Sequence, residues 1–454
     1  MILDNTDTIC AMATPAGGAI GVIRVSGKDA IDIVNRQVRP KDKLINAGHS
    51  TVNYCRFFDC NNEIIDEVLV SVFHTPRSYT GEDSVEISCH GSRYVMTQIL
   101  QTLVQKGCRQ AKPGEFTMRA FLNGKMDLSQ AEAVADLIAS TNRATHKMAV
   151  SQLKGCFSDE LKQLREQLLK LNSLLELELD FSDHEELEFA DRSELLDLVN
   201  TADDKIQILA NSFEAGRALK HGIPVAIVGK TNVGKSSLLN VLLQEDKAIV
   251  SDIHGTTRDS IEDVIDINGI SFRLIDTAGI RETSDTVERI GIERTFDNIS
   301  KSSVVLWVID GQPTTDELAE MTNKANGKKL IIVKNKCDLS SVKVSLPPTI
   351  PFVEISAKKQ ENINNLISLL VKTADIPEIN ENCVIVNNIR HYESLIHSHE
   401  HLVRVRESLE LGLSGDIVSE DLKLVLFELA DITGGMISTQ ETLNNIFSHF
   451  CIGK

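Results

Sequence analysis

The chain has 454 residues, 42% of them hydrophobic, and a net charge of −18. At roughly 100–200 residues per domain, this length predicts two to four domains. The acidic excess argues against tight binding of nucleic acid by the whole surface, because that affinity comes mainly from Lys and Arg on phosphates. It leaves a local basic patch or a basic partner subunit as alternatives.

The sequence shows no feature of a secreted or membrane protein. No uncharged apolar run approaches a membrane span, and the amino terminus, MILDNTDTIC, lacks the basic and apolar regions of a signal peptide. Nine cysteines are scattered without a C-x-x-C pair, which supports neither a disulfide framework nor a zinc site. We expect a cytoplasmic protein that does not enter a membrane.

Residues 1–120 alternate short apolar runs with turn residues. The apolar segment 19–25 predicts a strand, and so does the segment 64–72, in which alternate valines share one face. The spacing of apolar residues over 95–103 predicts a helix. The amino-terminal part is therefore expected to be an α/β or α+β domain.

The pattern becomes helical from residue 129 to about residue 219. Leucines recur there at alternating spacings of three and four, which predicts a buried helical seam; they are Leu161, Leu164, Leu168, Leu171 and Leu175. A helical pattern returns after residue 377. The economical interpretation is one helical domain with another domain inserted, and the alternative is two separate bundles. We expect domains over residues 1–122, 123–216, 217–376 and 377–454, the second and the last forming two parts of the helical domain.

Residues 229–236, GKTNVGKS, lie between a short apolar run, 225–228, and a predicted helix start, 237–242. A strand, a glycine-rich turn and a helix amino terminus together make an anion site of converging backbone N–H groups. Lys235 would neutralise the β- and γ-phosphates of a nucleotide, and Ser236 would ligate Mg²⁺. This loop alone indicates a nucleoside triphosphate without saying which base it carries.

Four further motifs follow in the order that a guanine-nucleotide domain requires. TTRD, 256–259, fits a first switch with a Mg²⁺-ligating Thr, and the Asp of DTAG, 276–279, would hold the Mg²⁺ shell through water. In NKCD, 335–338, the Asp338 carboxylate can accept from the N1–H and the exocyclic amine of guanine, which adenine does not offer in that arrangement. SAK, 356–358, would close over the base. The set predicts a doubly wound α/β fold for the third domain.

Ile280 follows the DTAG motif, at a position where many GTPases carry a water-orienting Gln. An isoleucine side chain has no polar atom with which to orient water. Either hydrolysis is slow, or a polar group further along the chain orients the attacking water.

Several segments together resemble the bacterial MnmE family of tRNA-modification GTPases, which is also called TrmE. They are the phosphate loop, 255–259 (GTTRD), 276–282 (DTAGIRE), the terminal CIGK at 451–454, and the amino-terminal stretches 14–27, 79–83 and 113–117. The resemblance covers nearly the whole chain. This sequence differs from the family pattern at residues 15–19, PAGGA, where the family often has an Arg.

The resemblance implies an amino-terminal folate-binding and dimerisation domain, a helical domain, and a P-loop G domain inserted into the helices. It implies a K⁺-dependent GTPase that acts as a homodimer with an FAD-dependent MnmG-type subunit in a heterotetramer. The complex would place an aminomethyl or carboxymethylaminomethyl group on C5 of the wobble uridine of certain tRNAs, which would bind mainly through the partner. A tetrahydrofolate derivative, either 5-formyl- or 5,10-methylene-tetrahydrofolate, would supply the one-carbon unit.

The resemblance also implies roles for individual residues in catalysis and metal binding. Glu288 would orient the attacking water through a bridging water, which answers the question raised by Ile280. Cys451 would act in the modification chemistry, with a packed cysteine as the alternative. The expected metal ligands are Ser236 and Thr257 for Mg²⁺, and Asn232, Ser251, Ile253 and Thr256 for K⁺.

The residues expected around the bound molecules follow from the same motifs. Those around GTP are Asn232, Val233, Gly234, Lys235, Ser236, Ser237, Ser251, Asp252, Ile253, His254, Gly255, Thr256, Thr257, Asp276, Thr277, Ala278, Gly279, Asn335, Lys336, Asp338, Ser356, Ala357 and Lys358. By resemblance, folate would contact Arg24, Glu86, Lys125 and Lys454, with the nearby Glu82 as an alternative to Glu86.

A second hypothesis is a regulatory or assembly GTPase that acts by binding alone, such as a ribosome-biogenesis factor. The G-domain motifs cannot separate the two hypotheses. The terminal CIGK and the amino-terminal stretches favour the modification enzyme. Folate binding by the amino-terminal domain would distinguish them.

Overall fold

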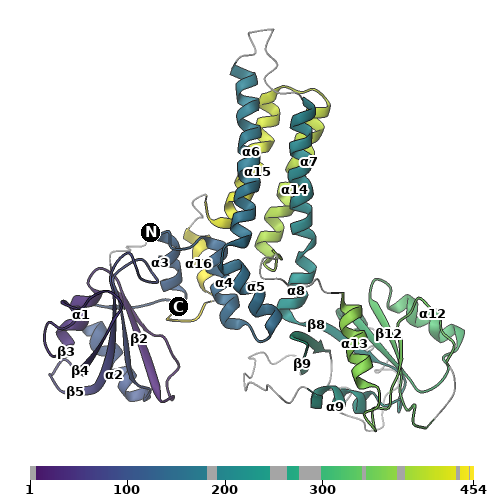
Figure 1. Cartoon of the computed structure of the whole chain (residues 1–454), viewed down its shortest axis with the longest axis horizontal. Coiled ribbons are helices and arrows are strands. Elements are labelled where there is room, and N and C mark those ends of the chain that lie inside the picture. Colours follow the sequence, from purple (N-terminus) through teal and green to yellow (C-terminus); the bar gives the residue numbers. More distant parts are fainter. Residues whose placement is uncertain are drawn as a thin grey trace. The chain divides into compact units, whose positions relative to one another are not determined.

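The computed structural model describes residues 7–180, 192–245, 263–275, 298–339, 344–375, 384–435, 440–448 and 450–453 (Figure 1). The chain divides into two compact units. Unit 1 comprises residues 1–139, 149–206 and 393–454, and unit 2 comprises residues 140–148 and 207–392. Among the described residues, no helix combines the length and the apolar character that crossing a membrane requires. The boundaries of the four segments expected from the sequence stay a prediction.

Unit 1 contains a seven-stranded sheet with the strand order β3-β4-β5-β6-β2-β1-β7. Neighbouring strands are antiparallel, except for the parallel pair β1 and β7. The strands are β1 (Ile9–Met12), β2 (Ile20–Ser26), β3 (Val38–Arg39), β4 (Thr51–Phe58), β5 (Ile64–Phe73), β6 (Ser84–His90) and β7 (Arg109–Gln110). The two strands predicted from the sequence are confirmed as β2 and β5.

One face of this sheet is covered by helices. Alternate residues of β2, Ile23 and Val25, are fully buried. They belong to one core cluster with Val34 of α1 (Ala30–Gln37) and with Met96 and Ile99 of α2 (Arg93–Gln105). A period of two on the strand and of three to four on the helix places these side chains on facing surfaces. The helix predicted over 95–103 is confirmed as part of α2.

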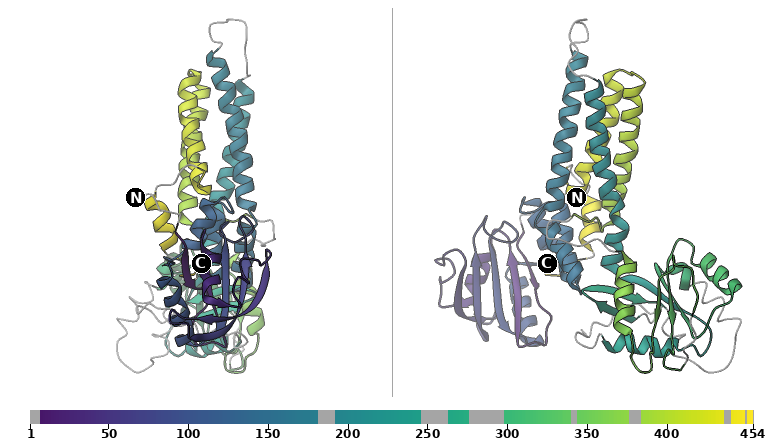
Figure 2. Two further views of the ribbon diagram at one scale, coloured as in Figure 1. Left: turned by 90° about the vertical axis from the view of Figure 1, so that its left-hand side faces the viewer. Right: turned by 45° about the vertical axis from the view of Figure 1, so that its right-hand side comes forward.

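Helices from both sides of the inserted domain pack together in unit 1. Figures 1 and 2 show α6 (Cys156–Asp180), α7 (Arg192–Asn211), α14 (Ile389–Glu410) and α15 (Gly415–Thr433) side by side. The Ser419 hydroxyl on α15 donates to Asn172 Oδ1 on α6 at 2.8 Å. The five seam leucines of α6 are at most 2% exposed. A single helical domain built from both segments is thereby confirmed, and the alternative of two separate bundles is wrong.

Shorter helices complete the helical part. They are α3 (Glu115–Leu122), α4 (Leu128–Ala139), α5 (Arg143–Leu153), α8 (Phe213–His221) and α16 (Gln440–Ser448). In unit 1, Met118 of α3 and Leu128 of α4 form a buried cluster with Leu443 and Phe447 of α16. Burial of this apolar surface holds the carboxy-terminal helix against a helix that directly follows the amino-terminal sheet.

Unit 2 contains a six-stranded sheet with the order β13-β12-β11-β8-β10-β9. All strand pairs are parallel except β9 with β10. Separate buried clusters cover its two faces, with α9 and α13 on one face and α12 on the other. The elements are β8 (Ile223–Val228), α9 (Lys235–Glu245), β9 (Asp263–Ile267), β10 (Ile270–Leu274), β11 (Val304–Ile309), α12 (Thr315–Lys324), β12 (Lys329–Lys334), β13 (Phe352–Glu354) and α13 (Ile363–Ala374). The predicted doubly wound α/β fold is confirmed.

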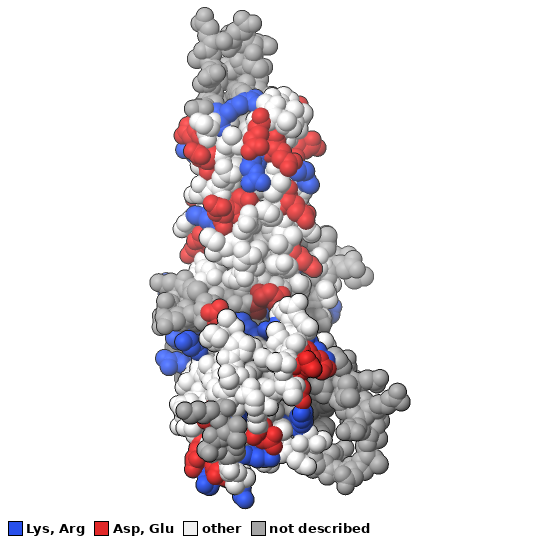
Figure 3. Space-filling view, turned by 90° about the vertical axis from the view of Figure 1, so that its right-hand side faces the viewer, with Lys and Arg blue, Asp and Glu red and all other residues white. Residues whose placement is uncertain are grey.

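The distribution of charge on the helices agrees with the acidic composition. On the face shown in Figure 3, Asp and Glu side chains outnumber the Lys and Arg side chains between them along the helices of unit 1. Among the residues described there, Lys and Arg form no continuous strip. A protein surface that binds nucleic acid by itself concentrates Lys and Arg on one face. This face of the helices does not have that character.

Candidate functional site

The loop between β8 and α9 is the predicted phosphate-binding loop, and its glycines allow close packing. Gly229 and Gly234 have positive φ values of +151° and +95°. A Cβ atom at Gly229 would collide with the Val308 carbonyl oxygen, and one at Gly234 would collide with the Asn335 side chain. Because α9 begins at Lys235, the N–H groups at its amino terminus point toward this loop. The backbone therefore has the arrangement that binds phosphate.

Lys235 is one of the two lysines of this loop, the other being Lys230. Its Nζ donates to the carbonyl oxygens of Gly229 at 2.8 Å and Lys230 at 2.7 Å. Burial lowers the pKa of the Lys235 ammonium group. Phosphate oxygens would counteract this effect, because an adjacent negative charge favours the charged form. The side chain thus lies at the loop and is electrostatically suited to an anion.

Asn335 connects the phosphate loop to the base-recognition motifs. It follows β12, is 3% exposed, and donates from Nδ2 to the Val233 carbonyl at 2.9 Å. Its Oδ1 accepts from the Ala357 N–H at 3.0 Å. One buried side chain therefore connects the three motifs GKTNVGKS, NKCD and SAK.

Asp338 lies beside the SAK motif, with a side chain that is 7% exposed. Its Oδ1 accepts a hydrogen bond from the Ser356 hydroxyl at 2.8 Å, and the Lys359 ammonium lies 3.9 Å from its Oδ2. The Ser356 hydrogen bond is the largest of the effects that lower the pKa of this carboxyl group. The carboxylate is ionised at neutral pH and keeps acceptor capacity for the N–H groups of guanine.

Other predicted nucleotide residues occupy the same edge of the sheet. Lys336 has a positive φ of +63° and pairs with Asp310 at 3.0 Å. In the phosphate loop, Asn232 is exposed with φ +64°, Ser236 is half-buried, and Ser237 is exposed at the start of α9. Lys358 is exposed beside Ala357. The described part of the G domain thus brings the predicted phosphate and base residues together.

Some predicted site residues lie outside the described residues. They are Ser251, Asp252, Ile253, His254, Gly255, Thr256, Thr257, Asp276, Thr277, Ala278, Gly279, Glu288 and Lys454. Ile280 also lies there. The roles expected for these residues stay predictions.

A second group of predicted residues gathers in unit 1 around Arg24. This guanidinium donates from Nε and Nη2 to Glu86 Oε1 at 3.0 and 2.8 Å. Its Cζ lies 5.4 Å from the ring centroid of Tyr79 and 5.7 Å from that of Phe116. Arg24 Nη1 also donates to the carbonyl oxygen of Gly453 at 3.3 Å. The carboxy-terminal tail, taken as residues 440–453, therefore reaches the sheet at a charged, aromatic site.

The alternatives Glu82 and Glu86 have different surroundings. Glu82 accepts from the Ser26 hydroxyl at 2.8 Å and from Arg119 at 3.2 Å, and Arg119 is only 1% exposed. The side chain of Glu86 is 32% exposed. A carboxylate already engaged in a buried network is poorly placed to meet a ligand, so these contacts favour Glu86. Lys125 contacts the loop that precedes Glu82. Its Nζ donates a hydrogen bond to the Pro76 carbonyl oxygen at 3.0 Å.

Three neighbours of these predicted residues were not identified from the sequence. Tyr79 and Phe116 flank Arg24, and Gly114 donates its N–H to the carbonyl oxygen of Cys451 at 3.3 Å. All three lie in the segments 79–83 and 113–117, which were singled out only as similar to the family. The segments carried the signal, but their contact with Arg24 and the tail depends on packing between distant parts of the chain.

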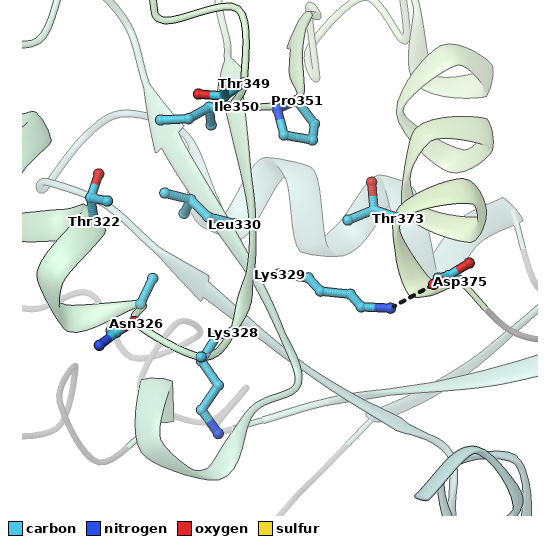
Figure 4. A pocket seen from close by; sticks show the side chains of 12 residues that line it. Thr322, Asn326, Lys328, Lys329, Leu330, Thr349, Ile350, Pro351, Thr373 and Asp375 are labelled. Atoms are coloured by element: carbon cyan, nitrogen blue, oxygen red, sulfur yellow. Dashed lines mark ion pairs between the residues drawn. The ribbon is translucent and has the colours of Figure 1, made fainter. Parts of the chain in front are cut away.

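A separate hollow of about 480 Å³ lies at the opposite edge of the G-domain sheet, at the amino end of β12 (Figure 4). It is lined by Thr322, Ala325, Asn326, Gly327, Lys328, Lys329, Leu330, Thr349, Ile350, Pro351, Thr373 and Asp375. None of the predicted site residues is among them. Ligands of open α/β sheets bind at the carboxyl ends of the strands, so this hollow is not the expected nucleotide site.

The fold and the two sites define a class of protein: a P-loop GTPase whose G domain is inserted into a helical domain that follows an amino-terminal sheet. Comparison with protein-family models makes the assignment narrower. The model of the MnmE helical domain matches residues 128–451, and the model described as "GTP-binding protein TrmE N-terminus" matches residues 8–125. The chain belongs to the MnmE family of tRNA modification GTPases.

Full-length relatives agree with this assignment. The chain is 51% identical to the tRNA modification GTPase MnmE of Phocaeicola vulgatus over 500 residues, with 100% of both chains covered. It is 52% identical to that of Bacteroides fragilis, covering 99% of this chain and 100% of the relative. The G domain of the T. maritima FeoB iron transporter matches at 23% identity over 34% of this chain and 99% of its own, with a TM-score of 0.25.

Proposed function

We propose that this chain is a K⁺-dependent GTPase that modifies C5 of the wobble uridine of certain tRNAs together with an FAD-dependent partner subunit. The product is an aminomethyl or carboxymethylaminomethyl group, and the one-carbon unit comes from a tetrahydrofolate derivative. The chain acts in the cytoplasm as a homodimer within a heterotetramer. The tRNA binds mainly through the partner, which is consistent with the net charge of −18.

The observation that carries the proposal is the contact between the carboxy-terminal tail and Arg24. Cys451 is exposed, and it lies two residues before Gly453, whose carbonyl oxygen accepts a hydrogen bond from Arg24. A GTPase that acts by binding alone has no evident need for this arrangement. A reduced folate offers pterin N–H groups, which a carboxylate accepts, and glutamate carboxylates, which Arg and Lys bind. Glu86, Arg24 and Lys125 have these properties, and Lys454 is a further proposed contact.

GTP hydrolysis is assigned to the other unit. Lys235 and Ser236 hold the phosphates and Mg²⁺ together with Thr257, and Asp338 selects guanine. A K⁺ ion bound by Asn232, Ser251, Ile253 and Thr256 supplies charge stabilisation of the kind that an arginine finger gives. Glu288 orients the attacking water, because Ile280 has no polar atom that could do so.

Analysis of tRNA nucleosides tests the modification. In cells that lack this chain, the wobble uridine should stay unmodified, and the wild-type chain should restore the modification. Cys451→Ser should fold and hydrolyse GTP normally without restoring it, because the serine hydroxyl lacks the nucleophilic thiolate state. Unchanged wobble uridine in cells without the chain would favour the regulatory GTPase instead.

The salt dependence of GTP turnover tests the role of K⁺. Turnover should be faster in K⁺ than in Na⁺ at equal ionic strength, and Asn232→Ala should remove most of the difference. Glu288→Ala should lower turnover by roughly 10²–10³-fold, as for loss of one positioned polar group, while nucleotide affinity changes little. Equal turnover of the wild-type chain in the two salts would contradict the proposed ion.

A further inference from the structure

Two phenylalanines near the carboxy end of the chain are held closely in unit 1. Phe447 and Phe450 are 2% and 9% exposed, and their ring centroids lie 5.2 Å apart. Both belong to the buried cluster that contains Met118 of α3 and Leu128 of α4. Burial of two phenylalanine side chains is a large stabilising term for a short helix such as α16.

The backbone around Cys451 is held on both sides, but the side chain is not enclosed. On one side, the Gly114 N–H donates to the Cys451 carbonyl oxygen at 3.3 Å. On the other, Gly453 is buried with φ +93°, and its carbonyl oxygen accepts from Arg24. Cys451 itself is exposed. A fixed backbone with an open side chain is the arrangement expected of a residue that must meet a partner molecule in one orientation.

Gly114 makes this arrangement sterically possible. It precedes α3 with a left-handed conformation, φ +65°. A Cβ atom there would lie 2.7 Å from the Phe447 carbonyl oxygen and 2.9 Å from Phe450 Cβ. Backbone atoms cannot move aside as a flexible side chain can, so any larger residue at position 114 would push the tail away.

We propose that Gly114 is a positioning residue: it forms the seat on which the carboxy-terminal tail docks, so that the Cys451 thiol is presented beside the Arg24–Glu86 pair. This inference rests on the proposed role of that thiol in tRNA modification. Gly453 has the matching role on the other side of the cysteine, because a Cβ atom there would collide with the Met12 carbonyl oxygen. Docking of the tail is required for modification and not for GTP hydrolysis, whose residues lie in unit 2.

The chain offers a matched control for Gly114. Gly124 has nearly the same conformation, φ +66°, but no atom lies within 4 Å of a Cβ built on it. Gly114→Ala and Gly124→Ala therefore both carry the cost of alanine in a left-handed conformation. Only Gly114→Ala adds the collision with the tail, so the difference between the two variants isolates the seat.

Hydrogen–deuterium exchange and tRNA nucleoside analysis test the proposal in the full chain. Gly114→Ala should raise the exchange rate of amides in residues 440–453 by about tenfold or more, since local opening is made easier. It should lower wobble-uridine modification by a similar factor and leave GTP turnover within about twofold. Gly124→Ala should leave tail exchange and modification close to wild-type values.

Three results would overturn the proposal for Gly114. The first is a Gly114→Ala chain whose tail amides stay protected from exchange. The second is an equal loss of tail protection and modification in Gly114→Ala and Gly124→Ala, and the third is full modification by a chain whose tail amides exchange freely. If Gly114→Ala does not fold, Gly453→Ala introduces a collision with the Met12 carbonyl oxygen from within the tail and must give the same exchange and modification results. Tail exchange also tests the seat independently of function: if Cys451→Ser retains modification, the proposed role of the thiol fails even where the seat is present.

Discussion

Two buried carboxylates in different regions, Glu115 in the amino-terminal part and Asp338 in the G domain, have opposite surroundings. Glu115 is 1% exposed, and both of its oxygens accept from within unit 1: from the Arg109 guanidinium, from Arg119 at 3.3 Å and from the Lys112 N–H at 2.8 Å. Asp338 receives one hydroxyl hydrogen bond and has a lysine ammonium at 3.9 Å.

The difference separates a carboxylate enclosed by protein partners from one that is proposed to bind guanine. Burial raises the pKa of Glu115, but the hydrogen bonds from Arg109 and Lys112 outweigh it, so the pKa lies below its usual value. The pKa of Asp338 is also lowered, chiefly by Ser356. Both groups are therefore charged at neutral pH, and the acceptor capacity that Asp338 keeps among the described residues supports its proposed role in binding guanine.

The largest expected effect is on nucleotide binding by Asp338→Asn. The amide would present an N–H group where guanine offers donors, and GTP affinity should fall on the order of 10⁴-fold. The wild-type chain should bind ITP, which lacks the exocyclic amine, more weakly than GTP, and the variant should lose that preference. Competition against a fluorescent GDP measures both. An unchanged GTP affinity would show that Asp338 is structural, like Glu115.

Glu115→Gln should instead reduce stability and leave nucleotide binding unchanged. Removing one partner of a buried ion pair leaves Arg109 and Arg119 undercompensated, which costs about 3 kcal/mol. The matched control is Glu67→Gln, which breaks the exposed pair with Arg56 and should cost less than about 1 kcal/mol. Urea unfolding of both variants gives the comparison, and equal losses would contradict it.

The pH dependence of stability follows from the same carboxylate. Because the folded pKa of Glu115 lies below its ordinary value of 4.5, its contribution is fully present above that pH and is lost as pH falls through the folded pKa. Asp7, whose pKa is lowered by hydrogen bonds from Arg109 and Arg119 despite burial, adds to this loss. The unfolding midpoint of the wild-type chain should fall with pH in this acidic range. Glu115→Gln should show a shallower fall.

Asn335→Ala should weaken GTP binding by about 10²-fold. The substitution leaves the Val233 carbonyl and the Ala357 N–H without their buried partner, at about 1–3 kcal/mol for each group. The effect is smaller than that of Asp338→Asn because the side chain positions the site without contacting the base in the proposed binding mode. Asn323→Ala, on an exposed turn of α12, is the control and should bind GTP normally.

The smallest effect is expected at the hollow on the opposite edge of the G-domain sheet. Lys329 lies 3.9 Å from Asp375 in an exposed pair, and such pairs contribute little. Lys329→Ala should change GTP affinity and turnover by less than about twofold. A larger change would mean that this edge communicates with the nucleotide site.

The motifs carried by short contiguous segments were predictable from the sequence. The phosphate loop depends on a local turn and a helix start, and the base motifs directly follow buried strands, so residue order and period were sufficient to predict a guanine-nucleotide domain. The leucine seam of α6 predicted a buried helical core. It did not decide whether the two helical segments form one domain or two bundles.

Sequence pattern alone determined which elements form and which motifs they carry, because both depend on neighbours along the chain. The tertiary structure decided which distant groups meet. Arg24, Phe116 and Gly453 come from three widely separated segments. Their contact depends on how helices pack on the sheet, which the local periodicity of the sequence does not specify. It likewise decided that Glu115 is saturated by Arg109 and Arg119 whereas Asp338 keeps acceptor capacity, because a carboxylate's role is set by the partners that surround it in space.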